Sequence, residues 1–155
     1  MSHPFIETLQ KHALTLGTVE SITGGLLADA LVSLNGASGW FKGGIIPYQR
    51  EAKSSWLGFD SKVMNSTGVV NATFAKEMII KGQKFLQTNI VIVSTGSAGP
   101  TAEMHSQVGD VFLGVGHEKH QLIKGFRLQG TRQEIRHQCV EKMWDLLNEF
   151  LRTYY

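Results

Sequence analysis

Residues 18–25 constrain the fold of this chain more than any other segment. They read Thr-Val-Glu-Ser-Ile-Thr-Gly-Gly, a short apolar strand pattern that enters a glycine-rich turn, and a helical pattern begins directly afterwards. Backbone N–H groups at a helix start have no intrahelical partners and carry the positive end of the helix dipole, so they attract anions. A hydroxyl nucleophile beside such an anion site would make a catalytic centre, and Ser21 is the candidate.

A second segment later in the chain has the same strand-to-loop organisation. Residues 89–94 are nearly all apolar, as expected for a strand buried on both faces, and they enter the loop Thr-Gly-Ser-Ala-Gly-Pro at 95–100. In open α/β sheets, ligands bind outside the carboxyl ends of the strands. We therefore expect both glycine-rich loops at one edge of the sheet, where they share a site.

Apolar periodicity and turn residues predict the remaining elements. Helices are expected over residues 4–16, 23–34, 50–57 and 71–86, and from 131 to the end. Strands are expected over residues 18–21, 40–48, 89–94, 109–117 and 120–129. Helices that interleave with strands indicate an α/β layered sheet, and the hairpin with its turn at Glu118-Lys119 makes that sheet mixed.

Composition narrows the class of protein. A chain of 155 residues suits a single domain over 1–155 with a real core. The net charge of +2 is too small to indicate nucleic-acid binding, and no apolar run approaches the ~20 residues of a membrane span. The N-terminus lacks the pattern of a signal peptide, and one cysteine permits no internal disulfide, so a cytoplasmic protein is the simplest expectation.

Ser21 needs a base to act as a nucleophile. Glu20 is adjacent, but neighbours on a strand point to opposite faces, so it is a poor candidate for a direct base. Tyr48 and Lys53 follow the next predicted strand, and a lysine desolvated in a pocket loses its proton near neutral pH. Alternatively, Ser21 only hydrogen-bonds a turn and Lys53 is a solvated surface charge.

The glycine-rich segments allow two interpretations each. Thr23 is a natural N-cap, and Gly24 and Gly25 would let backbone N–H groups approach a phosphate, but an ordinary helix start has the same pattern. The 95–100 loop could face a ligand or form a simple turn. Arg132 near the start of the last helix could reach an acidic ligand or lie on a solvated face. The six histidines show no metal-ligand spacing, so no metal and no cofactor is expected.

Taken together, these segments resemble the CinA C-terminal domain family, the nicotinamide-nucleotide amidase family. That family's pattern is Ala-Glu-Ser-Cys-Thr-Gly-Gly, then Gly-Ala-Ser, a Tyr with a Lys a few residues on, Thr-Gly-Ile-Ala-Gly-Pro and Gly-Asp-Arg-x-x-Ile-Arg. The matching positions, in the same order and spacing, are 19–25, 36–38, Tyr48 with Lys53, 95–100 and 130–136.

The resemblance implies a three-layer α/β/α sandwich and a metal-independent hydrolase in pyridine nucleotide salvage. Such an enzyme converts nicotinamide mononucleotide to nicotinic acid mononucleotide and ammonia, and family members commonly form homo-oligomers. Ser21 would be the nucleophile or orient the substrate, and Tyr48 and Lys53 would assist proton transfer. The residues expected to bind substrate or oxyanion are Glu20, Thr23, Gly24, Gly25, Thr95, Gly96, Gly99 and Arg132.

The chain departs from the family pattern at several positions near the predicted pocket. Ile22 replaces a cysteine, Asn71 a serine, Ser97 an isoleucine, and Ala102 and Glu103 replace glycines. A glutamate at 103 would repel a phosphate if it pointed inward. These changes also fit an alternative, a catalytically inactive paralogue that binds a nucleotide or a partner.

Overall fold

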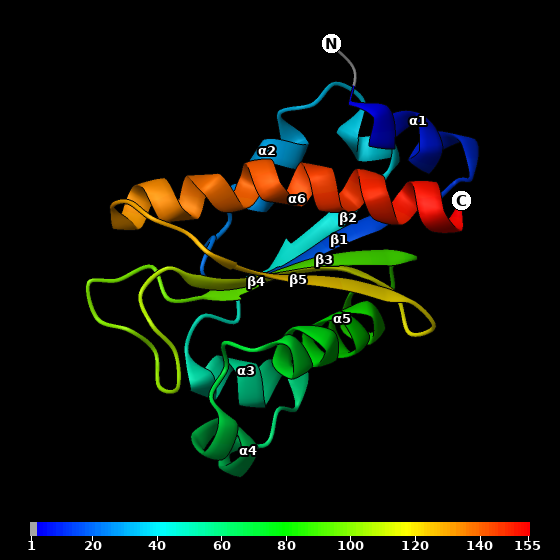
Figure 1. Cartoon of the computed structure of the whole chain (residues 1–155). Helices are drawn as coiled ribbons and strands as arrows, with labels where there is room; N and C mark the ends of the chain where they lie inside the picture. The colour runs from blue at the N-terminus through cyan, green and yellow to red at the C-terminus, as the bar shows by residue number, and fades with distance from the viewer. Residues whose placement is uncertain (1–2) are drawn as a thin grey trace.

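A five-stranded mixed sheet forms the centre of the molecule (Figure 1). The computed structural model describes residues 3–155. The strands, in the spatial order β2-β1-β3-β4-β5, are β1 (Leu16–Glu20), β2 (Phe41–Ile45), β3 (Ile90–Gly96), β4 (Asp110–Gly116) and β5 (Gln121–Arg127). β1 runs parallel to both of its neighbours, whereas β4 is antiparallel to β3 and to β5. The predicted hairpin therefore makes the sheet mixed, as expected.

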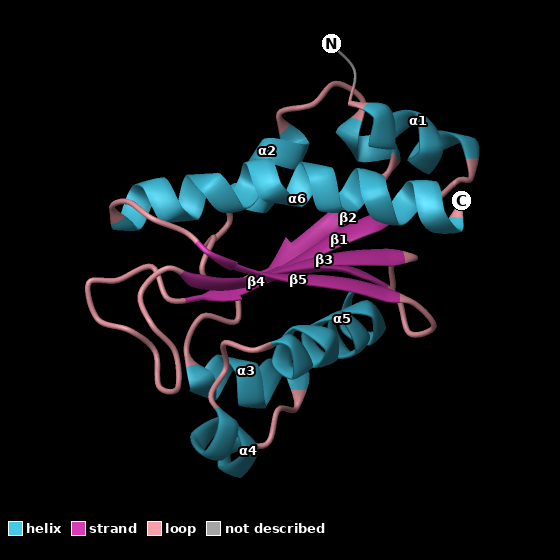
Figure 2. Ribbon diagram, viewed as in Figure 1, coloured by secondary structure: helices cyan, strands magenta, loops and turns pink. Residues whose placement is uncertain are grey.

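Helices cover both faces of the sheet, which confirms the three-layer α/β/α prediction (Figure 2). One layer contains α1 (Pro4–Lys11), α2 (Leu26–Val32) and α6 (Arg132–Tyr154). The opposite layer contains α3 (Arg50–Leu57), α4 (Ser61–Thr67) and α5 (Ala72–Leu86). Across residues 3–155, no helix is long and apolar enough to cross a membrane.

The alternation of side chains along β3 explains its continuous apolar sequence. Ile90 and Ile92 belong to the core cluster under α1, α2 and α6, while Val91 and Val93 belong to the cluster under α5. Each face of the strand therefore meets a helical layer, and every position in the run is buried. This burial holds the carboxyl end of β3 rigidly in the middle of the sheet.

The first helix is shorter than the sequence predicted. α1 ends at Lys11 rather than at residue 16, because Ala13 adopts a positive φ of 51° and turns the chain back toward the sheet. Leu16 and Gly17 then belong to β1, where Leu16 pairs with Phe41 and Ile90. The apolar spacing that indicated a helix at Leu16 is instead satisfied by burial in the sheet.

The prediction of Thr23 as the N-cap of the second helix is wrong. The N-cap is Gly25, at φ 108°, and the helix ends at Val32 rather than at 34. The Glu20 carboxylate caps this helix from the preceding strand, accepting backbone hydrogen bonds from Leu27 at 2.8 Å, Ala28 at 3.1 Å and Gly25 at 3.2 Å. A side chain five residues before the N-cap thus replaces a local cap.

Other elements follow the predictions more closely. Asn71 caps α5 by accepting from Phe74 N–H at 2.7 Å, and Thr131 caps α6 in a capping box with Glu134. β2 is shorter than the expected 40–48, and α4 was not predicted at all. α4 begins after Asp60, whose side chain accepts from the Lys62 N–H at 2.8 Å.

Candidate functional site

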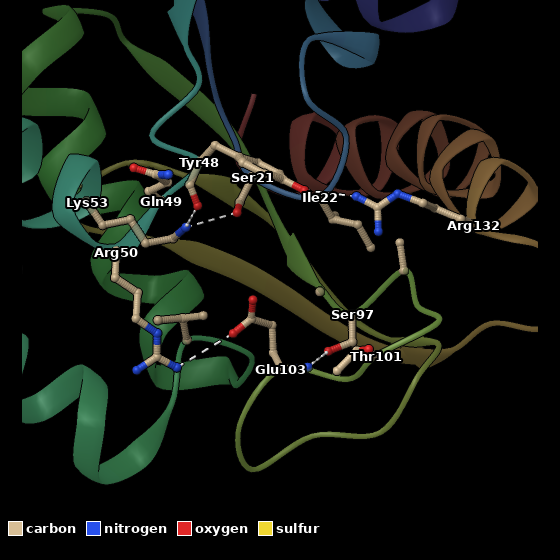
Figure 3. A pocket seen from close by; sticks show the side chains of 13 residues that line it. Ser21, Ile22, Tyr48, Gln49, Arg50, Lys53, Ser97, Thr101, Glu103 and Arg132 are labelled. Carbon is tan, nitrogen blue, oxygen red and sulfur yellow. Dashed lines mark hydrogen bonds and ion pairs between the residues drawn. The ribbon is translucent and has the colours of Figure 1, made fainter.

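A pocket of about 390 Å³ opens at the carboxyl ends of β1 and β3 (Figure 3). Glu20 pairs with Ser94 in the parallel register, so the segments that follow the two strands leave the sheet side by side. Ser21 and Gly96 consequently line the same pocket. The expectation that both glycine-rich loops meet at one edge is confirmed, and α3, the loop after β3 and the start of α6 supply the other walls.

Lys53 and Ser21 form a hydrogen-bonded pair in this pocket. The Lys53 Nζ donates to Ser21 Oγ at 3.0 Å and to the Tyr48 carbonyl oxygen at 2.7 Å. Only 2% of the Lys53 surface is exposed, so the interpretation of this lysine as a solvated surface charge is wrong. The first turn of α3 brings Lys53 to Ser21 across 32 residues of chain.

The environment of Lys53 favours its neutral form. Burial lowers the pKa of the Lys53 ammonium from 10.5 to about 8, the Glu103 carboxylate opposes that fall, and the Arg50 guanidinium adds to it. With a pKa of about 8, roughly one-tenth of the lysine is neutral at pH 7, far more than for an exposed lysine. A neutral amine within hydrogen-bond distance of a serine hydroxyl can accept its proton, which is the arrangement of a nucleophile and its base.

The Tyr48 side chain faces Arg132 instead of Lys53 (Figure 3). The Tyr48 hydroxyl accepts from Arg132 Nη2 at 2.9 Å, and Arg132 Nη1 donates to the Gly99 carbonyl at 2.6 Å. Tyr48 is 53% exposed, so its hydroxyl stays accessible from the pocket. Tyr48 therefore contacts Lys53 through its backbone carbonyl, whereas its hydroxyl hydrogen-bonds Arg132.

Glu20 and Thr23 lie behind the pocket wall. Both are fully buried, and Thr23 Oγ1 donates to Glu20 Oε1 at 2.7 Å while it also hydrogen-bonds Ser94 Oγ at 2.6 Å. As expected from strand geometry, the Glu20 carboxylate does not reach Ser21. Because that carboxylate occupies the N–H groups at the start of α2, the geometry gives this helix start a structural role instead of the predicted anion-binding one.

The other predicted glycine-loop residues divide between the pocket and its support. Gly96 lines the pocket, whereas the buried Thr95 hydroxyl donates to the Val69 carbonyl at 2.5 Å. Gly24 and Gly25 lie in the turn that Arg136 fixes, since its guanidinium donates to the carbonyls of residues 22 and 23, both at 3.0 Å. This clamp holds the backbone immediately after Ser21.

Two of the departures from the family pattern now have a structural account. Ile22 lines the pocket and fills space beside Gly96, where an added Cβ would lie 2.8 Å from Ile22 Cδ1. Ile22 therefore packs against the second loop and offers no reactive group. Asn71 caps α5 away from the pocket and does not touch Ser21 or Lys53.

Arg50 is a charged pocket residue that the sequence did not reveal. It lines the pocket, and its Nη2 lies 3.6 Å from the Glu103 carboxylate, while its Nη1 donates to the Met64 carbonyl and to Asn65. The Glu103 side chain points into the pocket. The proximity of Arg50 to Tyr48 and Lys53 in the sequence could have indicated a pocket residue. An arginine at the start of a helix is equally typical of an exposed position, so the sequence alone did not decide.

No metal site is visible in the described part of the chain. Among residues 3–155, no group of three or more His, Cys, Asp or Glu side chains is arranged to hold an ion. Cys139 is buried in the apolar face of α6, and burial raises the pKa of its thiol to about 12, so it is a core residue.

The fold and the buried serine–lysine pair define an α/β protein with its site at the carboxyl edge of a mixed sheet. The profile of the CinA C-terminal domain family matches residues 1–151, and the chain belongs to this family. A CinA-like protein of Flavobacterium psychrophilum is 33% identical over 94% of this chain, and a competence-damage inducible protein of Thermoanaerobacter pseudethanolicus is 36% identical over 97%. The chain spans only 35% and 37% of the lengths of those two relatives.

Solved structures share the same fold. A CinA superfamily protein from Klebsiella pneumoniae superposes with a TM-score of 0.91 at 23% identity, covering 98% of this chain and 96% of that one. The competence/damage inducible protein CihA from Agrobacterium tumefaciens superposes with a TM-score of 0.84 at 27% identity, covering 96% of this chain and 90% of its own. These structures match the α/β architecture over nearly the whole chain.

Proposed function

We propose that this chain is a metal-independent amidohydrolase that converts nicotinamide mononucleotide to nicotinic acid mononucleotide and ammonia. The observation that carries the proposal is the 3.0 Å hydrogen bond between Lys53 Nζ and Ser21 Oγ inside a pocket. This pair supplies a nucleophile and a base without an external group. The proposal includes a cytoplasmic homo-oligomer in pyridine nucleotide salvage.

In the first half of the proposed reaction, neutral Lys53 takes the Ser21 proton as Ser21 Oγ attacks the carboxamide carbon. The resulting tetrahedral oxyanion collapses when the Lys53 ammonium gives its proton to the leaving nitrogen, which departs as ammonia and leaves an ester on Ser21. In the second half, Lys53 takes a proton from water, the hydroxide attacks the ester carbon, and the proton returns to Ser21 Oγ. The net change is amide plus water to carboxylic acid plus ammonia.

Substrate binding is assigned to the opposite wall of the same pocket. Arg132 presents its guanidinium between the Gly99 carbonyl and the Tyr48 hydroxyl, both of them uncharged oxygens. An anionic phosphate is a stronger partner for that guanidinium than either of them. Gly96 lines the pocket beside Ser21, and Glu20, Thr23, Gly24, Gly25 and Thr95 act from behind by fixing the two loops.

Ammonia release from nicotinamide mononucleotide tests the proposal directly. Purified protein is expected to release ammonia in step with nicotinic acid mononucleotide, and the Ser21→Ala variant is expected to give only the uncatalysed background. The alternative, an inactive paralogue, predicts that the nucleotide raises the melting temperature of the wild-type protein without any turnover. Equal ammonia release by wild type and Ser21→Ala would remove Ser21 from the nucleophile's role.

The reaction is expected to accelerate with pH. Because the base must be neutral and the pKa of Lys53 is about 8, kcat/KM should rise ~10-fold per pH unit below that value and level off above it. Rates measured from pH 6 to 9.5 in buffers of constant ionic strength check this. A rate that is flat over this range would show that no group with such a pKa controls the step.

A further inference from the structure

Glu103 places a carboxylate in the same pocket as the serine–lysine pair. Its side chain is 49% exposed and lines the pocket wall contributed by the loop after β3 (Figure 3). The influence of this carboxylate reaches the reaction centre, because it raises the pKa of Lys53 against the effect of burial. A ligand group beside Ser21 therefore feels the negative charge of Glu103.

The loop holds the backbone of Glu103 firmly. The Glu103 N–H donates to Ser97 Oγ at 2.9 Å, and the Glu103 carbonyl accepts from the Ser106 hydroxyl at 2.8 Å and from the Ser106 N–H at 3.1 Å. The two serine hydroxyls also hydrogen-bond each other at 2.6 Å. Ser97 and Glu103, both departures from the family pattern, are thus joined in one network that presents the carboxylate.

The carboxylate of Glu103 keeps capacity for a further partner. Its contact with Arg50 Nη2 is 3.6 Å long, beyond hydrogen-bond distance, and Arg50 also donates to Met64 and Asn65. An ionised carboxylate offers about four acceptor sites. On another wall of the pocket, Arg132 contacts the uncharged oxygens of Gly99 and Tyr48. The pocket therefore presents the Glu103 carboxylate, with Arg50 beside it, and the Arg132 guanidinium on different sides of Ser21 (Figure 3).

We infer that Glu103 is a specificity-determining residue, which selects substrates that carry a cationic ring in addition to an anionic group. The inference rests on the proposed function, whose substrate has a pyridinium ring and a phosphate. The carboxamide that Ser21 attacks is bonded directly to this ring, so the ring lies where Glu103 acts. The phosphate extends toward Arg132, away from the carboxylate that would repel it. A charge pair in this half-exposed setting changes affinity by about 10-fold.

Calorimetric binding to the Ser21→Ala protein tests the inference without any turnover. The probes are nicotinamide mononucleotide and its reduced dihydropyridine form, which retains the carboxamide, ribose and phosphate but lacks the positive charge on the ring. We expect the Ser21→Ala protein to prefer the cationic probe by about 10-fold, and the added Glu103→Gln change to reduce this preference to less than about 2-fold. Thermal melts establish that each variant is folded.

Arg50→Gln is the matched control, because it removes the ion pair but keeps the carboxylate. The preference for the cationic probe should survive it. Equal weakening of both probes by Glu103→Gln would overturn the inference, since a role in loop structure or in the Lys53 proton equilibrium acts on both alike. Failure of both probes to bind would overturn it as well. A retained, Glu103-dependent preference without ammonia release from wild type would sustain the inference while removing the proposed reaction.

Discussion

Lys53→Met is expected to slow turnover strongly and to make the protein more stable. Methionine has nearly the length of lysine and suits the buried position, but it cannot accept the Ser21 proton. Loss of a general base costs about 10²–10⁴-fold in rate. The hydrogen bond to Ser21 Oγ and the one to the Tyr48 carbonyl are both lost. Ammonia release should fall by this factor while the fold persists.

The gain in stability comes from the energetic cost of burying the ammonium. A pKa lowered from 10.5 to about 8 corresponds to about 3 kcal/mol of bias against the charged form in the folded state. Methionine avoids that cost, and the two lost hydrogen bonds offset part of the gain, so we expect a net stabilisation of about 1–2 kcal/mol at pH 7. Between pH 8 and 10.5 the unfolded lysine keeps a proton that the folded one has released. Wild-type stability therefore rises through this window, and the advantage of methionine narrows.

Urea unfolding at pH 7 and pH 10, combined with the ammonia assay, checks both parts. Lys62→Met is the matched control, because Lys62 is exposed on α4. It should leave the rate unchanged and alter the free energy of unfolding by less than about 0.5 kcal/mol. A Lys53→Met protein that is less stable than wild type at pH 7 would show that the hydrogen bonds of Lys53 outweigh its desolvation.

The layers of the fold could be predicted because periodicity reports burial. The unbroken apolar run at 90–93 required helices on both faces, and the structure has them. Ends of elements were harder, since they depend on contacts that are remote in sequence. Leu16 fits a helical stripe equally well, and only its pairing with Phe41 and Ile90 decides for the strand. α4 carries a single buried apolar side chain, Met64, so its pattern was too weak to detect.

The centre of the candidate site and part of its walls, Tyr48 and Arg132, were predictable, whereas the contacts that position the other walls were not. Strand-to-loop patterns placed Ser21 and Gly96 at one edge, the position of Lys53 after the next predicted strand made it a candidate base, and the resemblance matched it to a family position. Local patterns could not show that Glu20 caps α2 from the strand, because a cap is normally read within three or four residues of the helix start. The inward direction of Glu103 depends on its hydrogen bond to Ser97 and on Arg50, which are contacts between separate segments.

Replacing Glu20 by alanine is expected to be among the most destabilising single changes near the pocket. Its buried carboxylate accepts from the Thr23 hydroxyl and from three backbone N–H groups of the turn and α2. Without it the three N–H groups lose this partner in a site with little access to water, whereas the Thr23 hydroxyl keeps Ser94 Oγ. Each unsatisfied buried donor costs about 1–3 kcal/mol. Allowing for relaxation, we expect a loss of about 3–5 kcal/mol from a domain of typical stability, near 5–15 kcal/mol.

The same variant separates the capping role of Glu20 from the substrate-binding role that the family resemblance implied. Urea unfolding of Glu20→Ala and of Asp29→Asn compares two carboxylates in one strand–helix unit, since Asp29 is exposed in the first turn of α2. Asp29→Asn should cost less than about 1 kcal/mol, the scale of a surface interaction with the helix dipole. If Glu20 bound substrate, its removal would weaken nucleotide binding and leave the free energy of unfolding close to that of wild type. The capping role predicts the opposite, a large loss in the free energy of unfolding. Any weakening of nucleotide binding would then be a consequence of that loss, because the backbone that carries Ser21 is continuous with the turn that Glu20 closes.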